Sequence, residues 1–86
     1  MANVIIYSTK VCPYCIRAKQ FFESRSIDYT ELRVDEDQHL RQEMETKSGG
    51  RRTVPQIFIN DQHVGGYDDL MAMARTDALD KLLKGE

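Results

Sequence analysis

The chain has 86 residues, of which 41% are hydrophobic, and a formal net charge of −2 at pH 7. This length predicts one domain over residues 1–86, and the interspersed charges argue against binding to nucleic acid or to a membrane surface. Neither a leader pattern nor an apolar run of roughly 20 residues appears, so we expect a cytoplasmic protein. Two cysteines three positions apart are not the framework of a disulfide-stapled secreted fold.

The first half of the chain predicts two strands and two helices. A strand over the apolar, β-branched residues 3–8 precedes a helix that has Pro13 in its first turn and ends near Ser24. The core-facing residues of this helix recur at i, i+3 and i+7: Cys15, Ala18 and Phe22. Residues 29–34 alternate apolar and charged side chains, as in a strand with one polar face.

A second helix is predicted after Asp35 or Asp37, either of which can cap its start. Leu40 and Met44 form its apolar face, and the pair Gly49-Gly50 ends it. Because the order so far is strand, helix, strand, helix, the two strands are expected to be parallel and joined by a right-handed crossover.

The second half of the chain predicts a hairpin and two short helices. A strand over residues 56–59 pairs with one at 63–64 in an antiparallel hairpin. The residues expected to bound these elements are Pro55, the turn 60–62, Gly65, Gly66, and the helix caps Asp68 and Asp77. The full order is β-α-β-α-β-β-α-α, an α/β fold with a four-stranded mixed sheet and helices on both faces.

The segment Cys12-Pro13-Tyr14-Cys15 indicates a redox centre. At a helix start, the helix dipole, the free N–H groups of the first turn and the nearby Lys10 charge favour a Cys12 thiolate. Such surroundings lower a thiol pKa from about 8.5 into a range of roughly 3.5–7.5. Residues at i and i+3 are near enough for a disulfide after a small adjustment. We predict that Cys12 is the exposed attacking thiolate and Cys15 the buried resolving thiol.

Two other roles for the cysteine pair stay open at this point. A Cys-x-x-Cys segment can form half of a zinc site, but the only histidines, His39 and His63, lie far apart in the sequence. The cysteines could also be inert core residues. Neither alternative explains why Pro13 and Tyr14 separate the sulfurs, and we expect no metal site.

Three segments carry a resemblance to a known family. They are Cys-Pro-Tyr-Cys at 12–15, Thr-Val-Pro-Gln-Ile-Phe-Ile at 53–59 and Gly-Gly-Tyr-Asp-Asp-Leu at 65–70. In order and spacing they resemble the dithiol glutaredoxins of the short bacterial form, over essentially the whole chain. A thioredoxin would show Trp-Cys-Gly-Pro-Cys, and this chain has no Trp. The resemblance implies a thioredoxin-like fold, glutathione as the reductant and a cis bond between Val54 and Pro55.

The resemblance also implies a set of glutathione contacts near the cysteines. Lys10 corresponds to the residue that meets the glycyl carboxylate, helped by Arg51 or Arg52. Tyr14 corresponds to a ring that packs beside the bound sulfur. The plain alternatives are that the cations are solvated loop charges and that the tyrosine is a surface aromatic.

The remaining implied contacts come from the second and third segments. Thr53, Val54 and Pro55 correspond to a backbone clamp that pairs with glutathione as an added strand does. Asp68 corresponds to the partner of the γ-glutamyl ammonium, and the N–H groups of Tyr67 and Asp68 to the site of its carboxylate. The chain departs from the family at Tyr67, where Cys or Ser is frequent, so the larger ring is expected to crowd the γ-glutamyl end or to change which proteins fit.

The activity implied by the resemblance is glutathione-dependent reduction of protein–glutathione mixed disulfides and of protein disulfides, in electron transport and redox homeostasis. The implied partners are glutathione and oxidised proteins, with ribonucleotide reductase as a family-level expectation, and the implied state is a monomer. Two rival functions stay open. One is a module that bridges a [2Fe–2S] cluster, against which Pro13 argues because cluster-holding relatives usually have Gly or Ser there. The other is a thioredoxin-like reductant served by a flavoenzyme.

Overall fold

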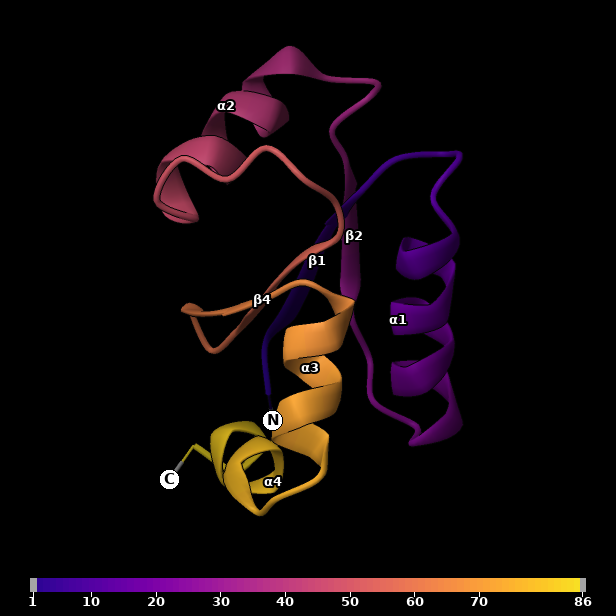
Figure 1. Ribbon diagram of the computed structural model, residues 1–86, viewed down its shortest axis with the longest axis vertical. Helices are drawn as coiled ribbons and strands as arrows, with labels where there is room; N and C mark the ends of the chain where they lie inside the picture. The colour runs from indigo at the N-terminus through magenta and orange to yellow at the C-terminus, as the bar shows by residue number, and fades with distance from the viewer. Residues whose placement is uncertain (1, 86) are drawn as a thin grey trace.

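The computed structural model describes residues 2–85. Within this range, four strands and four helices follow one another in the predicted order (Figure 1). Their bounds are β1 Val4–Ser8, α1 Pro13–Ser24, β2 Thr30–Arg33, α2 Gln38–Lys47, β3 Gln56–Ile59, β4 Gln62–Gly65, α3 Tyr67–Ala74 and α4 Ala78–Leu83.

The strands form one mixed sheet in the order β2-β1-β3-β4. β1 and β2 are parallel, whereas β1 with β3 and β3 with β4 are antiparallel. The parallel pair needs a crossover, which α1 supplies. The predicted four-stranded mixed α/β sheet is therefore confirmed.

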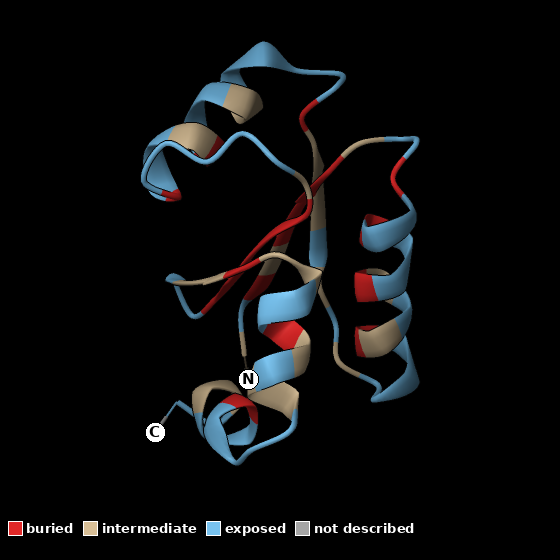
Figure 2. Ribbon diagram, in the orientation of Figure 1, coloured by how far each residue is buried: buried red, intermediate tan, exposed pale blue. Residues whose placement is uncertain are grey.

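Helices cover both faces of this sheet, as predicted. Side chains of α1, α3 and α4 pack with those of β1 and β3 in the larger core cluster, formed by Val4, Ile6, Ala18, Phe22, Ile57, Ile59, Leu70 and Leu79. The opposite face carries a smaller cluster under α2, formed by Tyr7, Val34, Met44 and Phe58. Figure 2 shows the buried residues along the central strands and on the inward sides of α1 and α3. β1 and β3 therefore read as nearly continuous apolar runs because both of their faces are covered.

Two of the predicted boundaries are settled, one by a capping contact and one by backbone angles. Of the two candidate caps for α2, Asp37 is the cap, because its Oδ1 accepts a hydrogen bond from the His39 N–H at 2.8 Å. The hairpin turn is one residue shorter than predicted. Asn60 and Asp61 have φ angles of 52° and 66°, the left-handed values that a two-residue hairpin turn of type I′ requires, and Gln62 already belongs to β4.

The predicted cap of α3 is wrong by two positions. The N-cap residue is Gly66, and its N–H donates to Asp69 Oδ2 at 2.9 Å. Asp68 therefore lies inside the first turn, because Asp69 supplies the capping carboxylate three residues after the cap. At α4, Asp77 occupies the cap position but its side chain makes no capping bond. Thr76 Oγ1 instead accepts from the Ala78 N–H at 3.1 Å.

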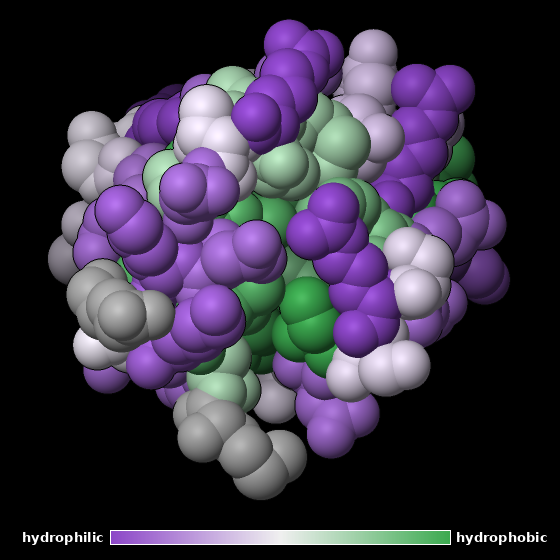
Figure 3. Space-filling view, turned by 90° about the horizontal axis from the view of Figure 1, so that it is seen from below, coloured by the Kyte–Doolittle hydropathy of each residue, from purple (hydrophilic) through white to green (hydrophobic). Residues whose placement is uncertain are grey.

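The end of the molecule that holds α4 also holds the chain termini (Figure 1). Seen from below, this end shows hydrophobic residues at its centre among hydrophilic ones (Figure 3). A cavity of about 260 Å³ here is lined by Ala2, Ser26, Ile27, Asp28 and Leu83. In residues 2–85, no helix is both long enough and apolar enough to cross a membrane.

Candidate functional site

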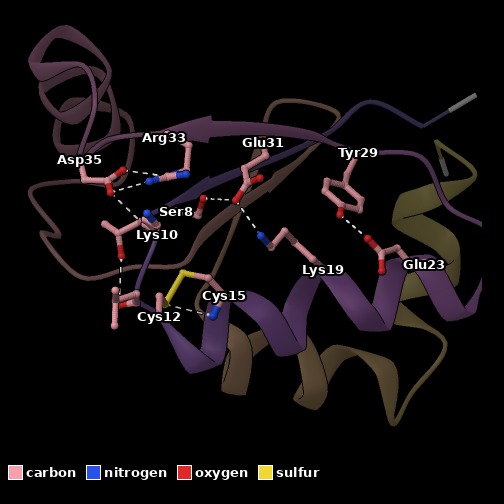
Figure 4. Close-up of polar contacts among 12 residues, drawn as sticks. Ser8, Lys10, Cys12, Cys15, Lys19, Glu23, Tyr29, Glu31, Arg33 and Asp35 are labelled. Carbon is pink, nitrogen blue, oxygen red and sulfur yellow. Dashed lines mark hydrogen bonds and ion pairs between the residues drawn. A yellow bond between two sulfur atoms is a disulfide. The ribbon is translucent and has the colours of Figure 1, made fainter.

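The two cysteines lie at the start of α1, on the side of the sheet that carries α3. Cys12 is the N-cap residue, and Pro13 opens the helix. Cys12 and Cys15 form a disulfide with their Cα atoms 5.2 Å apart. The Cys15 N–H donates to Cys12 Sγ at 3.1 Å (Figure 4). A free N–H group of the first helical turn thus points at the sulfur that is expected to become the thiolate.

The exposure of the sulfurs differs from the prediction. Cys15 is fully buried, as expected, but Cys12 is also buried, with only 7% of its surface exposed. Cys12 Sγ is bonded to Cys15 Sγ, and the Val54 carbonyl oxygen lies 3.8 Å from Cys12 Sγ. Cys12 is therefore the more accessible of the two, but in the disulfide form its neighbours cover most of it.

Exposed apolar side chains are close to the two cysteines in the sequence. Among the described residues, the large hydrophobic side chains that are mainly exposed are Val11 at 88%, Tyr14 at 50% and Ile16 at 46%. All three belong to the loop and first helical turn that hold the cysteines. Clustered exposed apolar surface is typical of a place where other molecules dock.

Two ion pairs and a buried serine fix α1 and the preceding loop against the sheet (Figure 4). Lys19 Nζ lies 2.9 Å from Glu31 Oε2, which also accepts a hydrogen bond from the buried Ser8 hydroxyl at 2.5 Å. Burial raises the pKa of Glu31, but the bonds from Ser8 and Lys19 outweigh it and lower the pKa overall. The Lys10 N–H donates to Asp35 Oδ2 at 3.0 Å, and Arg33 pairs with the same carboxylate.

The loop before β3 approaches the cysteines across the sheet end. The Val54–Pro55 peptide bond is cis, as the resemblance implies. Gln56, the first residue of β3, is fully buried, and its Nε2 donates to the Thr53 carbonyl and to Thr53 Oγ1, both at 3.1 Å. Its Oε1 lies 2.7 Å from His63 Nε2. Gln56 and His63 thus hold the loop in place, a role that no pattern in the sequence predicts.

A cavity of about 130 Å³ is lined by Tyr14, which lies between the two cysteines in the sequence, and by Val54, whose carbonyl oxygen is 3.8 Å from Cys12 Sγ. Its walls come from the start of α1, the loop before β3 and the start of α3, which are far apart in the sequence. The predicted site residues that line it are Tyr14, Thr53, Val54, Pro55, Tyr67 and Asp68, and they are joined by Arg51, Gly66 and Asp69. The start of α3 presents backbone N–H groups that its helix leaves without partners.

Two predicted contacts do not line this cavity. Lys10 is an exposed residue of the loop before α1. Arg52 turns to α2, where its Nε lies 3.3 Å from Glu45 Oε1 and its side chain is 81% exposed. Arg51 is the arginine at the cavity, and its Nη1 lies 3.6 Å from Asp69 Oδ2.

Two aromatic rings border the cavity. Tyr14 and Tyr67 stack with ring centroids 5.8 Å apart and an interplanar angle of 27°. The Arg17 guanidinium lies 5.3 Å from the Tyr14 ring centroid, a distance at which a cation and a ring attract. The ring at position 67 therefore packs against Tyr14, and both rings line the cavity.

A metal site would need a group of side chains that could bind the ion. Among residues 2–85, no three His, Cys, Asp or Glu side chains gather as a metal-binding group.

Comparison with known proteins identifies relatives along the whole chain. The Glutaredoxin family model matches residues 4–64. The chain is 51% identical to Glutaredoxin 3 of Escherichia coli over 84 residues, which cover 98% of this chain and 100% of that protein. It is 49% identical to a glutaredoxin of Pseudomonas aeruginosa, with 96% and 98% covered.

Solved structures agree with these relatives. A buckwheat glutaredoxin–glutathione complex superimposes with a TM-score of 0.86 at 28% identity, covering 98% of this chain and 78% of that one. The solution structure of a glutaredoxin from Brucella melitensis gives 0.81 at 41% identity, with 100% and 94% covered. The sheet order and helix placement are thus those of a thioredoxin-like fold. With its Cys-Pro-Tyr-Cys disulfide at the start of α1, the chain is a thiol–disulfide oxidoreductase, and it belongs to the glutaredoxin family.

Proposed function

We propose that this protein uses glutathione to reduce protein–glutathione mixed disulfides and protein disulfides. The observation that carries the proposal is the position of the disulfide, which lies at a helix start beside a cavity walled by the loop before β3 and the start of α3. Glutathione as the ligand is supported by the buckwheat relative, which is described as a glutathione complex.

Cys12 is the nucleophile of the proposed reaction. In the reduced protein, the Cys15 N–H and the positive end of the α1 dipole stabilise a Cys12 thiolate. This thiolate attacks the glutathione sulfur of a mixed disulfide, the old S–S bond breaks, and the substrate protein leaves as a thiolate that takes up a proton. A second glutathione thiolate then attacks the new disulfide, releasing oxidised glutathione and restoring Cys12.

Protein disulfides use both cysteines. Cys12 attacks one sulfur of the substrate, and Cys15 then attacks Cys12 Sγ, which releases the reduced substrate and leaves the Cys12–Cys15 disulfide seen here. Two glutathione molecules reduce that bond in turn. Because glutaredoxin potentials lie at about −200 to −230 mV, near the glutathione poise, the pair can run in either direction.

Glutathione is placed by backbone groups and by two charges. Val54 pairs with the peptide of glutathione as a neighbouring strand would, which brings the glutathione sulfur to Cys12. The N–H groups of Tyr67 and Asp68 receive the γ-glutamyl carboxylate, and the Asp68 carboxylate receives its ammonium. Arg51 is better placed than Arg52 for the glycyl carboxylate, because only Arg51 lines the cavity. Lys10 adds long-range attraction for an anionic tripeptide.

The proposed partners are glutathionylated and disulfide-bonded proteins, with ribonucleotide reductase as the family-level candidate. The exposed apolar residues close to the two cysteines in the sequence, Val11, Tyr14 and Ile16, support contact with protein surfaces. We propose that the protein is a monomer and that it acts in the cytoplasm. There, the glutathione pool would keep its two cysteines reduced.

Turnover of a small glutathionylated substrate tests this proposal, with glutathione as the only reductant and its oxidation followed by coupling to glutathione reductase. Cys12→Ser should abolish turnover. Cys15→Ser should retain deglutathionylation and lose the reduction of protein disulfides, because only that route needs the second thiol. Activity that survives Cys12→Ser, or that needs thioredoxin reductase in place of glutathione, would contradict the proposal.

The glutathione contacts have their own test. Asp68→Ala should raise the KM for the glutathionylated substrate by roughly tenfold, since it removes a charged partner worth about 1.5 kcal/mol. The matched control is Asp80→Ala on α4, an exposed acidic residue that lines none of the cavities described here. An unchanged KM in Asp68→Ala would remove this residue from the site.

A further inference from the structure

A groove between α1 and α3 continues from the site cavity. This open groove has a volume of about 570 Å³ and shares the lining residues Tyr67 and Asp68 with the site cavity. Figure 1 shows α1 and α3 next to each other. The residues that line the groove belong to these two helices or directly follow them. A ligand longer than a tripeptide, bonded at Cys12, can therefore extend from the cavity into this groove.

The groove has an apolar floor. Phe21 on α1 and Met71 and Ala74 on α3 line it, and all three are partly buried side chains that pack on the core. An apolar side chain of a ligand would lose water-exposed surface here against residues that are already fixed. The floor therefore favours a peptide with a hydrophobic residue at this point.

The far end of the groove is cationic. Arg25 and Arg75 both line it, and the Arg25 guanidinium lies 4.4 Å from the Phe21 ring centroid, which holds the cation over the apolar floor. Within residues 2–85, neither arginine forms an ion pair, although five other pairs are present. The near end carries Asp68 instead, so the charge changes sign along the groove.

The distance between these charges determines how long a bound peptide must be to contact both ends of the groove. Arg75, the residue that follows α3, lies seven positions after Asp68, which is a rise of about 10 Å at about 1.5 Å per residue. An extended peptide covers that length with about three residues at 3.3 Å each. The arginines therefore meet residues that lie several positions away from the reacting cysteine.

We propose that this groove binds the flanking segment of a disulfide-bonded protein substrate and selects a segment with an apolar residue followed by acidic residues. The proposal rests on the route for protein disulfides described above. The Cys12 thiolate attacks one substrate sulfur, whose partner sulfur leaves and is protonated. Cys15 then attacks Cys12 Sγ, the second substrate thiolate leaves and is protonated, and two electrons have passed from the protein dithiol to the substrate.

Single-turnover kinetics of the pre-reduced protein test the selection without any glutathione. The probes are oxidised Cys-x-x-Cys peptides in which a Leu is followed by either Glu-Glu or Lys-Lys. In a series of such peptides, the charged pair is placed at increasing distances from the disulfide, on its N-terminal or its C-terminal side. The wild type should reduce the best Glu-Glu peptide about fivefold faster than its Lys-Lys twin, the effect of two exposed ion pairs. This preference should shrink as salt is added. The net charge of −2 would by itself favour the basic peptide, so an acidic preference reports on the groove.

Charge reversal of the arginines supplies the decisive comparison. Arg25→Glu/Arg75→Glu should invert the Glu-to-Lys rate ratio, and Arg25→Gln/Arg75→Gln should bring it near one. Lys81→Glu/Lys84→Glu, at the end of α4 and directly after it, changes the net charge equally and should keep the wild-type ratio. Equal rates for both wild-type peptides at every spacing, or a ratio unchanged by the arginine variants, overturns the proposal. Because no glutathione is present, either result is distinct from a failure of glutathione-dependent turnover.

Discussion

Gln56 is a fully buried polar residue in a strand of apolar neighbours, yet its side-chain amide is satisfied at both ends. Its Nε2 donates to two oxygens of Thr53, and its Oε1 accepts from His63 Nε2. Because Thr53 lies in the loop that forms the cavity wall, one side chain of the sheet fixes the loop beside the disulfide. Buried polar groups with all partners present specify one arrangement of their neighbours.

Replacing Gln56 by Leu should therefore cost stability and loosen the site. The change leaves the Thr53 carbonyl and the His63 ring without their partner, which costs about 1–3 kcal/mol of the free energy of unfolding. Urea unfolding measures this cost, and the KM for a glutathionylated substrate should rise with it. Gln62→Leu, at an exposed position on the neighbouring strand β4, is the control and should change the stability by less than about 0.5 kcal/mol. Equal effects of the two changes would show that the amide bonds hold nothing in place.

His63 gives the stability of the protein a dependence on pH. Burial, followed by the Arg51 charge, lowers the pKa of His63 below its ordinary value, although Asp69 opposes this. On acidification from pH 7, the unfolded chain takes up a proton at its usual pKa of about 6.5 before the folded protein does, so stability should fall. The fall should end once the pH lies below the folded pKa.

The measurement is the urea midpoint between pH 5 and pH 7.5 in three proteins. His63→Gln should show a smaller decrease on acidification than the wild type, whereas exposed His39→Gln should behave like the wild type. A wild-type midpoint that rises on acidification, or one that His63→Gln does not alter, contradicts the assignment.

The sequence predicts single residues well where the chemistry is local. The Cys-Pro-Tyr-Cys segment is both motif and helix start, so the position of Cys12 follows from neighbours in the chain. The role of Gln56 does not, because its partners Thr53 and His63 depend on the hairpin and on the path of the preceding loop. Which of Arg51 and Arg52 lines the cavity also depends on tertiary structure. Adjacent side chains point in different directions, and only the folded loop decides which one faces the cavity.

At the scale of elements, the start of α3 both ends the hairpin and lines the cavity of the candidate site. Gly65 ends β4 with a φ of 116°, and the Asp69 carboxylate occupies the place where a Cβ would project. The same carboxylate accepts from the Gly66 N–H and pairs with Arg51. The sequence predicts Asp68 as the cap because an acidic residue precedes the apolar positions. The left-handed turn at Gly65 starts the helix earlier, which moves the capping role to Asp69 and leaves Asp68 facing the cavity.

Substitutions at these two neighbouring carboxylates should therefore have different effects. Asp69→Ala removes the cap and should lower the free energy of unfolding by about 1 kcal/mol. Asp68→Ala should change the stability by less than about 0.5 kcal/mol and should act on the KM for the glutathionylated substrate. Thermal or urea unfolding, together with steady-state kinetics, separates the two. The assignment of roles is wrong if Asp68→Ala proves the more destabilising change.

For the molecule as a whole, the two faces of the sheet divide stability from function. The face that carries α1 and α3 holds the larger core cluster together with the disulfide and the cavity. The opposite face carries α2, which is joined to the sheet by Met44 and by the Tyr7 hydroxyl bound to Glu43 at 2.6 Å. Burial and this carboxylate raise the pKa of Tyr7. The order and faces of the elements follow from periodicity, whereas the meeting of residues 14, 51, 53–55 and 66–69 at one cavity follows only from how the layers stack.

Two core truncations test this division. Leu70 on α3 and Met44 on α2 are both fully buried, and each change to Ala should cost about 2–5 kcal/mol of the free energy of unfolding. That loss is a large part of the 5–15 kcal/mol typical of a whole domain, so both variants must be assayed at a temperature where they remain folded. There, Leu70→Ala should also raise the KM for the glutathionylated substrate, because a cavity under α3 lets the N–H groups of its first turn shift. Met44→Ala should leave the KM near the wild-type value, since α2 contributes no residue to the cavity. If both variants weaken substrate binding equally, the sheet transmits changes between its faces and the site is not confined to one of them.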